Sequence, residues 1–182
     1  MELKFSINLT EEDYIEYNKF VMFRSSYGKK RMLKIRIAVA LVILVYSVIH
    51  LLLRGVSTVS FITLLPYLLV LIIYQLIYKP LVVWEIKMSV RSQKKRGKVG
   101  YATNSEMVFL EDCFIESTDH NKTEQKYSAI DRVSVVGDKV IYIQVNSLMS
   151  YVMPVSCFET KEKYDEFMTF IKTKCNNVEF YQ

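Results

Sequence analysis

The sequence predicts a membrane-embedded α-helical hairpin of two spans joined to a cytoplasmic α+β domain. Three observations carry this prediction. The 182 residues have a positive mean hydropathy of +0.15, and the apolar excess is concentrated between Ile37 and Tyr78. Basic residues flank that apolar region on both sides. Short segments typical of β-strands follow from Tyr101 onwards, and one more lies at residues 3–9.

The N-terminal region, residues 1–36, combines a strand pattern with a helix pattern. Residues 3–9 alternate strictly between apolar and polar side chains, which is typical of a half-buried strand. Thr10 can cap a helix with an acidic first turn, and we expect this helix to continue through the basic flank into the first apolar run. Because an isolated strand needs a sheet, we expect residues 3–9 to pair with the C-terminal sheet, so that both ends of the chain form one cytoplasmic domain.

The apolar region, residues 37–78, divides into two runs that can each cross a bilayer. Ile37–Leu53 has 17 residues and covers about 26 Å of a hydrocarbon core about 30 Å thick. The second run, Val56–Tyr78, contains Pro66, which a membrane helix tolerates when neighbouring groups satisfy the freed carbonyl. Only Arg54 and Gly55 lie between the runs, so the sequence predicts an antiparallel hairpin.

Charge sets the expected orientation of the hairpin. Thirteen Lys and Arg residues flank it at 24–36 and 79–98, against the single carboxylate of Glu85, whereas Arg54 alone carries a charge at the tip. Basic flanks face the cytoplasm, so we expect a two-span protein of the cell membrane with both termini inside. The residues expected to meet anionic lipid head groups form a basic collar: Lys29, Lys30, Arg31, Lys34, Arg36, Lys94, Lys95 and Arg96. Because the pI near 9.0 originates in these flanks, it does not indicate nucleic-acid binding.

Residues 79–98 are expected to form a separate juxtamembrane segment. Pro80 should interrupt the second span, and Val83–Lys98 has the pattern of an amphipathic basic helix. Gly97 and Gly100 are expected to end that helix.

The C-terminal region, residues 99–182, carries a net charge of −5 and changes to a pattern of six short strands. The strongest turn signal between them is Gly137-Asp138, and His120-Asn121 and Asn146-Ser147 are weaker signals. Thr160 then begins a helix with one apolar stripe. These patterns predict an antiparallel β-sheet or a partial barrel that is closed by a C-terminal helix. The expected strands are 107–110, 113–117, 123–127, 132–136, 139–145 and 149–153.

This order of elements resembles the YcxB-like family of bacterial membrane proteins. The residues that carry the resemblance are LTEEDY at 9–14, YSAI at 127–130, IYI at 141–143 and YVMP at 151–154, followed by Phe158. The resemblance implies a C-terminal domain similar to the pleckstrin-homology (PH) type. It implies no molecular activity, because the family has no established one.

Residue types that carry catalysis or bind metals are sparse in the sequence. His120, in an expected turn, is the only histidine of the predicted cytoplasmic part, and Glu111-Asp112 is expected to be a solvated turn. Cys113 and Cys157 are expected to fill the core. The sequence has no glycine-rich phosphate loop and no metal-ligand spacing. We therefore expect no enzymatic activity, no cofactor and no metal site.

Polar side chains within the spans leave two functions open. His50 in the first span and Gln75, Tyr67 and Tyr74 in the second can either bond the two helices to each other or line a path. The first hypothesis is a non-enzymatic, membrane-anchored protein-interaction or scaffolding module that binds a protein partner or a second copy of the chain. The alternative is a small subunit of a membrane transport or sensing assembly that works through the hairpin.

Overall fold

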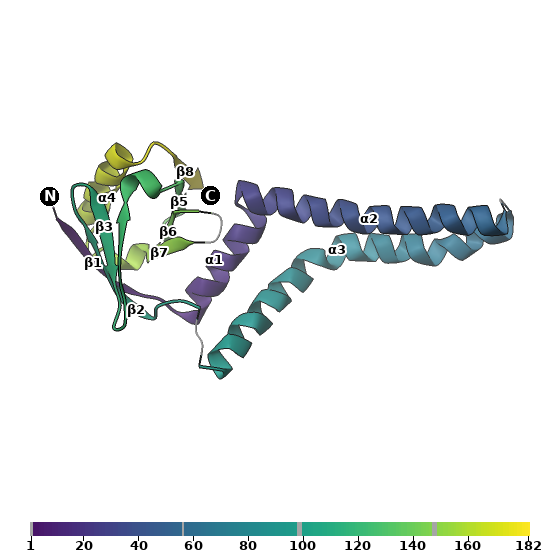
Figure 1. Ribbon diagram of the computed structural model, residues 1–182, viewed down its shortest axis with the longest axis horizontal. Coiled ribbons are helices and arrows are strands. Elements are labelled where there is room, and N and C mark those ends of the chain that lie inside the picture. The colour runs from purple at the N-terminus through teal and green to yellow at the C-terminus, as the bar shows by residue number, and fades with distance from the viewer. Residues whose placement is uncertain (1, 56, 98–99, 147–148) are drawn as a thin grey trace. The chain divides into compact units, whose positions relative to one another are not determined.

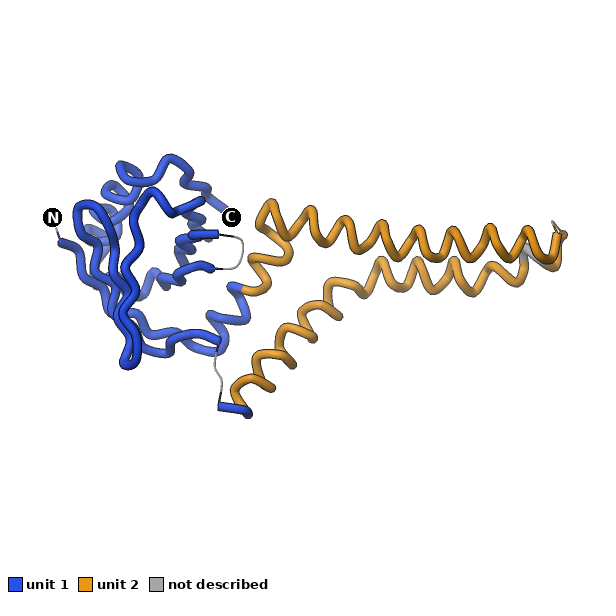
Figure 2. Tube along the Cα trace, viewed as in Figure 1, with its two compact units in different colours: residues 1–17, 96–182 blue, residues 18–95 orange. Residues whose placement is uncertain are grey.

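The computed structural model describes residues 2–55, 57–97, 100–146 and 149–182 (Figure 1). It separates into two compact units (Figure 2). The sheet unit contains residues 1–17 and 96–182, and the hairpin unit contains residues 18–95. Both ends of the chain therefore belong to the sheet unit, and the hairpin unit is an insertion between them.

The described part of the sheet unit contains two four-stranded sheets (Figure 1). The first has the order β1-β2-β3-β4, with β1 at Leu3–Asn8, β2 at Asn104–Phe109, β3 at Cys113–Ser117 and β4 at Lys122–Lys126. The second has the order β7-β6-β5-β8, with β5 at Arg132–Val136, β6 at Val140–Gln144, β7 at Ser150–Pro154 and β8 at Val178–Tyr181. Neighbouring strands are antiparallel except β5 and β8, which are parallel.

The expected N-terminal strand pairs with the C-terminal region. β1 is antiparallel to β2, and Phe5 lies opposite Met107. The side chains of Phe5 and Ile7 are only 5% and 1% exposed, whereas Lys4, on the opposite face, forms an ion pair with Glu106 at 2.7 Å. The prediction that residues from both ends of the chain share one sheet is confirmed.

The core of the sheet unit contains side chains of both sheets and of α4 (Lys161–Lys174). The ring of Phe167 on α4 lies 5.5 Å from that of Phe5 and 4.9 Å from that of Phe109. Thr160 caps α4, since its hydroxyl accepts a hydrogen bond from the backbone N–H of Lys163. The predicted C-terminal helix is therefore confirmed as a cover of the sheets, although the two sheets do not close into a barrel.

Two details of the sheet unit differ from the sequence prediction. All six expected strands are present as β2 to β7, but they do not form one sheet. A 3-10 helix at Tyr127–Ala129 separates β4 from β5, which belong to different sheets. Tyr127 is buried there, and its hydroxyl donates to the carbonyl oxygen of Leu110 at 2.8 Å. β8 was not predicted, because it has four residues and its pairing partner, β5, is distant in the sequence.

Two of the expected turns join antiparallel strands as predicted. Gly137 lies between β5 and β6 with a φ of +51°, a conformation that glycine adopts without steric cost. His120-Asn121 lies between β3 and β4, where the Thr118 N–H donates to the Asn121 carbonyl. Both predictions are confirmed. Ser147 of the third expected turn, Asn146-Ser147, lies outside the described residues.

Three helices connect β1 to β2: α1 (Glu11–Phe23), α2 (Ser26–Arg54) and α3 (Thr58–Lys95). The prediction of one helix running from Thr10 into the first span is wrong, because α1 ends and α2 begins at a corner. Ser25 caps α2 by accepting from the Gly28 N–H at 3.0 Å and donates to the Val21 carbonyl at 2.6 Å. A Cβ on Gly28 would lie 1.8 Å from the Val21 carbonyl oxygen, so this corner requires glycine.

The prediction that Pro80 separates two helices is also wrong. α3 is continuous over 38 residues and contains both Pro66 and Pro80. Each proline removes one backbone hydrogen bond at a local cost of about 3 kcal/mol, which bends a long helix without ending it. α3 lies beside α2 over its first part and diverges from it further on (Figure 1). It ends at Lys95, and Gly97 follows with a φ of +67°, whereas Lys98 lies outside the described residues.

Residues 99–182 without β1 should fail to unfold cooperatively, because the core then lacks the side chains of Phe5 and Ile7. Burial of each contributes about 1.5 to 3 kcal/mol to the free energy of folding. Supplying residues 1–20 through a flexible linker should restore a cooperative urea transition measured by circular dichroism. In that linked protein, Phe5→Ala should lower the free energy of unfolding by about 3 to 5 kcal/mol. The exposed-site control Ser6→Ala should change it by less than about 0.5 kcal/mol. Cooperative unfolding of residues 99–182 alone would contradict this account.

Gly28→Ala should open the corner between α1 and α2, because the added methyl group overlaps the Val21 carbonyl. We expect tryptic cleavage after the exposed Arg24 to become about tenfold faster in the full-length protein in detergent micelles. Tyr27→Ala, at an exposed position of the same turn, is the matched control and should leave the cleavage rate unchanged. Equal rates for Gly28→Ala and the native chain would show that the corner does not depend on the missing side chain.

Candidate membrane-contact site

Five residues of the basic collar lie in the first turns of α2. Lys29, Lys30, Arg31 and Lys34 are exposed, and Arg36 is half-buried. Since an α-helix turns by about 100° per residue, these five positions are distributed around the helix axis and do not share one face. The collar residues of α2 therefore surround the helix and do not form a patch on one side of it.

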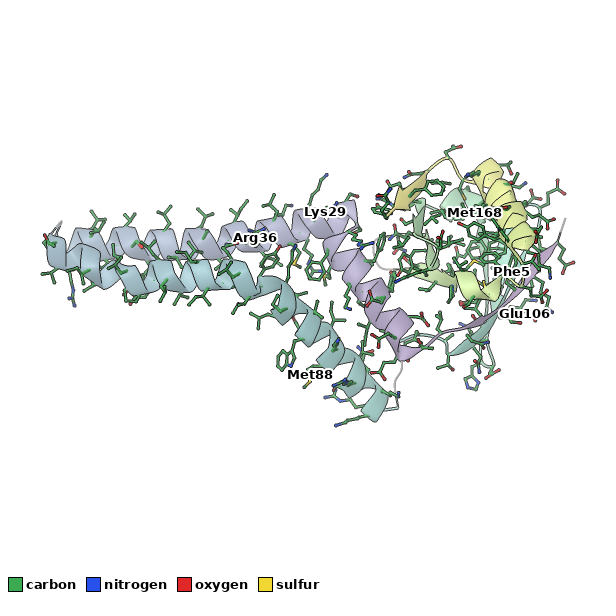
Figure 3. The ribbon with its side chains drawn as sticks, turned by 180° about the vertical axis from the view of Figure 1, so that it is seen from behind. Phe5, Lys29, Arg36, Met88, Glu106 and Met168 are labelled. Atoms are coloured by element: carbon green, nitrogen blue, oxygen red, sulfur yellow. The ribbon has the colours of Figure 1, made fainter. Side chains whose placement is uncertain are left out.

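The other three collar residues lie at the far end of α3. Lys94 and Lys95 are in its last turn, and Arg96 is in the turn that follows. Within the hairpin unit, the start of α2 and the end of α3 diverge, so the structure does not bring the collar together as one ring (Figure 2). Figure 3 shows Met88 on this diverging part of α3, away from Lys29 and Arg36 on α2.

Three polar pairs connect α2 to α3 among the described residues. Each pair joins one side chain of α2 to one side chain of α3, and the three pairs lie at different levels along the hairpin. The Arg36 Nε donates to the Gln75 Oε1 at 2.7 Å, the hydroxyls of Tyr46 and Tyr67 are 3.2 Å apart, and the His50 Nε2 is 2.8 Å from the Thr63 Oγ1.

Two of the three pairs share one antiparallel register. A step of four residues along α2, from Tyr46 to His50, matches a step of four back along α3, from Tyr67 to Thr63. The prediction that His50 and Gln75 can bond to the opposite helix is confirmed. Tyr74 is not part of these pairs and lines a groove instead.

This groove, which we call the fork groove, lies where α2 and α3 diverge and has a volume of about 350 Å³. It lies beside the Arg36 guanidinium, which is 4.7 Å from the centroid of the Tyr78 ring. This groove was not predicted from the sequence. The one available signal was Glu85, the single carboxylate among the basic flanks, which is one of the lining residues. The lining residues are Met22, Arg31, Met32, Ile35, Arg36, Tyr74, Tyr78, Val82 and Glu85.

The cysteines of the sheet unit are poor nucleophiles. Burial raises the pKa of Cys157 to about 12 and that of Cys175 to about 11. Burial, with the nearby Glu124 carboxylate, also raises the pKa of Cys113. The reactive thiolate is therefore scarce at neutral pH. As expected, Cys157 packs against the core, whereas Cys113 is half-buried in β3 outside the core cluster.

The remaining candidate residues do not converge. His120, Glu111 and Asp112 are exposed in turns between strands of the first sheet. Within the described ranges, no three His, Cys, Asp or Glu side chains lie close enough together to hold a metal ion. Of the polar candidates, His50, Gln75 and Tyr67 each meet a side chain of the opposite helix, and Tyr74 lines the fork groove.

Comparison with known proteins adds one similarity. Residues 109–171 match the family model of the YcxB-like proteins. The matched segment covers about a third of the chain, from the end of β2 into α4, and it includes the YSAI, IYI and YVMP sequences. The match supports a YcxB-like relationship for this segment. No curated protein and no solved structure gave a significant match.

Proposed function

We propose that this protein is a membrane-anchored, non-enzymatic protein-interaction or scaffolding module of the bacterial YcxB-like type. The observation that carries the proposal is the insertion of a long apolar hairpin between two paired strands of one sheet unit. The hairpin is the anchor, and the sheet unit is the part that binds a protein partner or a second copy of the chain.

The exposed apolar surface of the hairpin supports insertion into a bilayer. α2 and the segment 62–95 of α3 are both long and apolar enough to span a membrane. In the most apolar 18-residue stretch of each helix, only 0% and 6% of the residues are buried. The core helix of a soluble protein would be mostly buried. An apolar surface of this length would aggregate in water, so it needs a lipid environment.

The strand pairing supports the proposed orientation. Because β1 and β2 are neighbours in one sheet, the chain must return to the side of the membrane from which it left. The basic flanks lie at these two ends of the hairpin, next to the sheet unit in the sequence, and basic flanks face the cytoplasm. We therefore assign the sheet unit and both termini to the cytoplasm, and the collar to anionic head groups of the inner leaflet.

The element order supports a PH-like assignment of the sheet unit. Apart from the hairpin unit, which is inserted after β1, the order is four strands (β1–β4), three further strands (β5–β7) and the helix α4. β8 is an addition to this order. The net charge of −5 over residues 99–182 disfavours nucleic acid and polyphosphate ligands and favours a protein partner.

The polar pairs of the hairpin favour this proposal over a transport or sensing subunit. A transport path would need polar side chains that face a water-filled space, whereas Gln75, His50 and Tyr67 each have a partner on the opposite helix. Hydrogen bonds between membrane helices contribute about 0.6 to 2 kcal/mol each, so these pairs stabilise the hairpin.

The orientation can be tested by cysteine labelling in intact cells, in a chain whose three native cysteines are replaced. Ser57→Cys should react with a membrane-impermeant maleimide, and Asn8→Cys should react only after the membrane is permeabilised. Both residues are exposed in their own units, so burial does not produce the difference. Labelling of position 8 in intact cells would overturn the proposed orientation.

The assignment of function can be tested by exchanging the hairpin. Replacing residues 37–78 by an unrelated two-span hairpin should leave the proteins recovered by affinity purification from mild detergent unchanged. Removing the sheet unit while keeping the native hairpin should abolish their recovery. If the recovered proteins follow the native hairpin instead, the protein acts through its spans, and the transport or sensing alternative is correct.

A further inference from the structure

We propose that the fork groove binds the head group of one anionic phospholipid from the cytoplasmic leaflet. This inference deepens the proposed function, because it rests on the insertion of the hairpin into a bilayer. It names a specific lipid site in place of the general attraction of the collar.

The charges of the groove match a ligand with one negative charge. Arg31 and Arg36 line it together with Glu85, so its formal net charge is +1. A head group with several phosphates would be attracted by the arginines and repelled by the carboxylate. A phospholipid with a single net negative charge, such as phosphatidylglycerol, matches this balance, and its hydroxyl groups can donate to Glu85.

Arg36 is held in place before any ligand binds. Its Nε donates to the Gln75 Oε1 at 2.7 Å, and its guanidinium lies 4.7 Å from the Tyr78 ring centroid. A guanidinium has five N–H donors, so this bond leaves the terminal nitrogens for phosphate oxygens. A side chain that is fixed in its bound position loses little conformational entropy on binding.

The position and lining of the groove fit the boundary between head groups and acyl chains. Arg36 is the last basic residue before the apolar run, and Arg31 lies about 7.5 Å further from that run along the helix axis. Met32, Ile35 and Val82 provide apolar contacts for the glycerol and the first acyl carbons. A volume of about 350 Å³ is suited to a head group with its glycerol rather than to a whole lipid.

The experiment is native mass spectrometry of the full-length protein in detergent, titrated with phosphatidylglycerol or with phosphatidylcholine. Arg31→Gln should weaken retention of phosphatidylglycerol about tenfold, since a charge-assisted hydrogen bond is lost. Lys30→Gln is the matched control: it removes the same charge from the neighbouring residue, which does not line the groove, and should weaken retention by less than about twofold. Arg31→Lys should give an intermediate value, because it keeps the charge but loses the planar pair of donors.

Three outcomes would overturn the proposal. Equal losses for Arg31→Gln and Lys30→Gln would show general attraction to the collar. Equal retention of phosphatidylcholine would show that the groove does not select net negative charge. Competition by free glycerol 3-phosphate at the same concentration as the lipid would show a site for small soluble anions. Because the labelling of Ser57→Cys measures insertion separately, a negative lipid result in an inserted protein refutes the groove alone.

Discussion

The antiparallel pairing of β1 with β2 is the constraint on which the rest of the structure depends, because it joins two segments that are separated by the whole hairpin unit. Closing a flexible loop of this length costs about 4 kcal/mol in chain entropy, beyond a constant term. Burial of Phe5 and Ile7, at about 1.5 to 3 kcal/mol each, is of the size needed to offset that cost. The hairpin lowers the cost further, since two antiparallel helices return the chain towards its starting point. The strand pair and the hairpin therefore favour each other's formation.

The two units of the chain bury opposite kinds of side chain. In the sheet unit, Phe109, Phe114 and Phe167 are fully buried, and charged residues such as Lys4 and Glu106 face outwards. In the hairpin unit, Leu52 and Leu53 are about four-fifths exposed, and the polar side chains of Tyr46, His50 and Gln75 meet partners on the facing helix. A single solvent would not favour both arrangements. Water suits the first, and a bilayer, in which polar groups must be satisfied inside the protein, suits the second.

Much of the fold could be predicted from local patterns, and what could not depends on distant contacts. The alternation at residues 3–9, the cap at Thr160 and the turn at Gly137 act within a few residues, so the sequence shows them directly. β8 could not be predicted, because its four residues become a strand only through β5. The corner at Ser25 and Gly28 depends on a close approach of two backbone segments, and the spacing of hydrophobic residues does not indicate such an approach.

Of the candidate site, the sequence shows the collar residues and their charge. It does not show that Arg31, Arg36 and Glu85 line one groove, because they lie on two helices.

Pro80 explains why this groove exists. On α3, the residues that line the groove lie on both sides of the proline, with Tyr74 and Tyr78 before it and Val82 and Glu85 after it. A proline inside a helix removes the hydrogen bond to the carbonyl four residues earlier and bends the helix. If α3 were straight, it would continue along α2, and Arg36 and Tyr78 would be covered by the helix interface. The bend instead separates α3 from α2 at the level where the apolar run of α2 begins.

The length of α3 also exceeds what a membrane anchor needs. A membrane span needs only about 20 residues, whereas α3 has 38, so anchoring alone does not require the bent continuation. The proline, with its local cost of about 3 kcal/mol, therefore accompanies the groove that Arg36 lines.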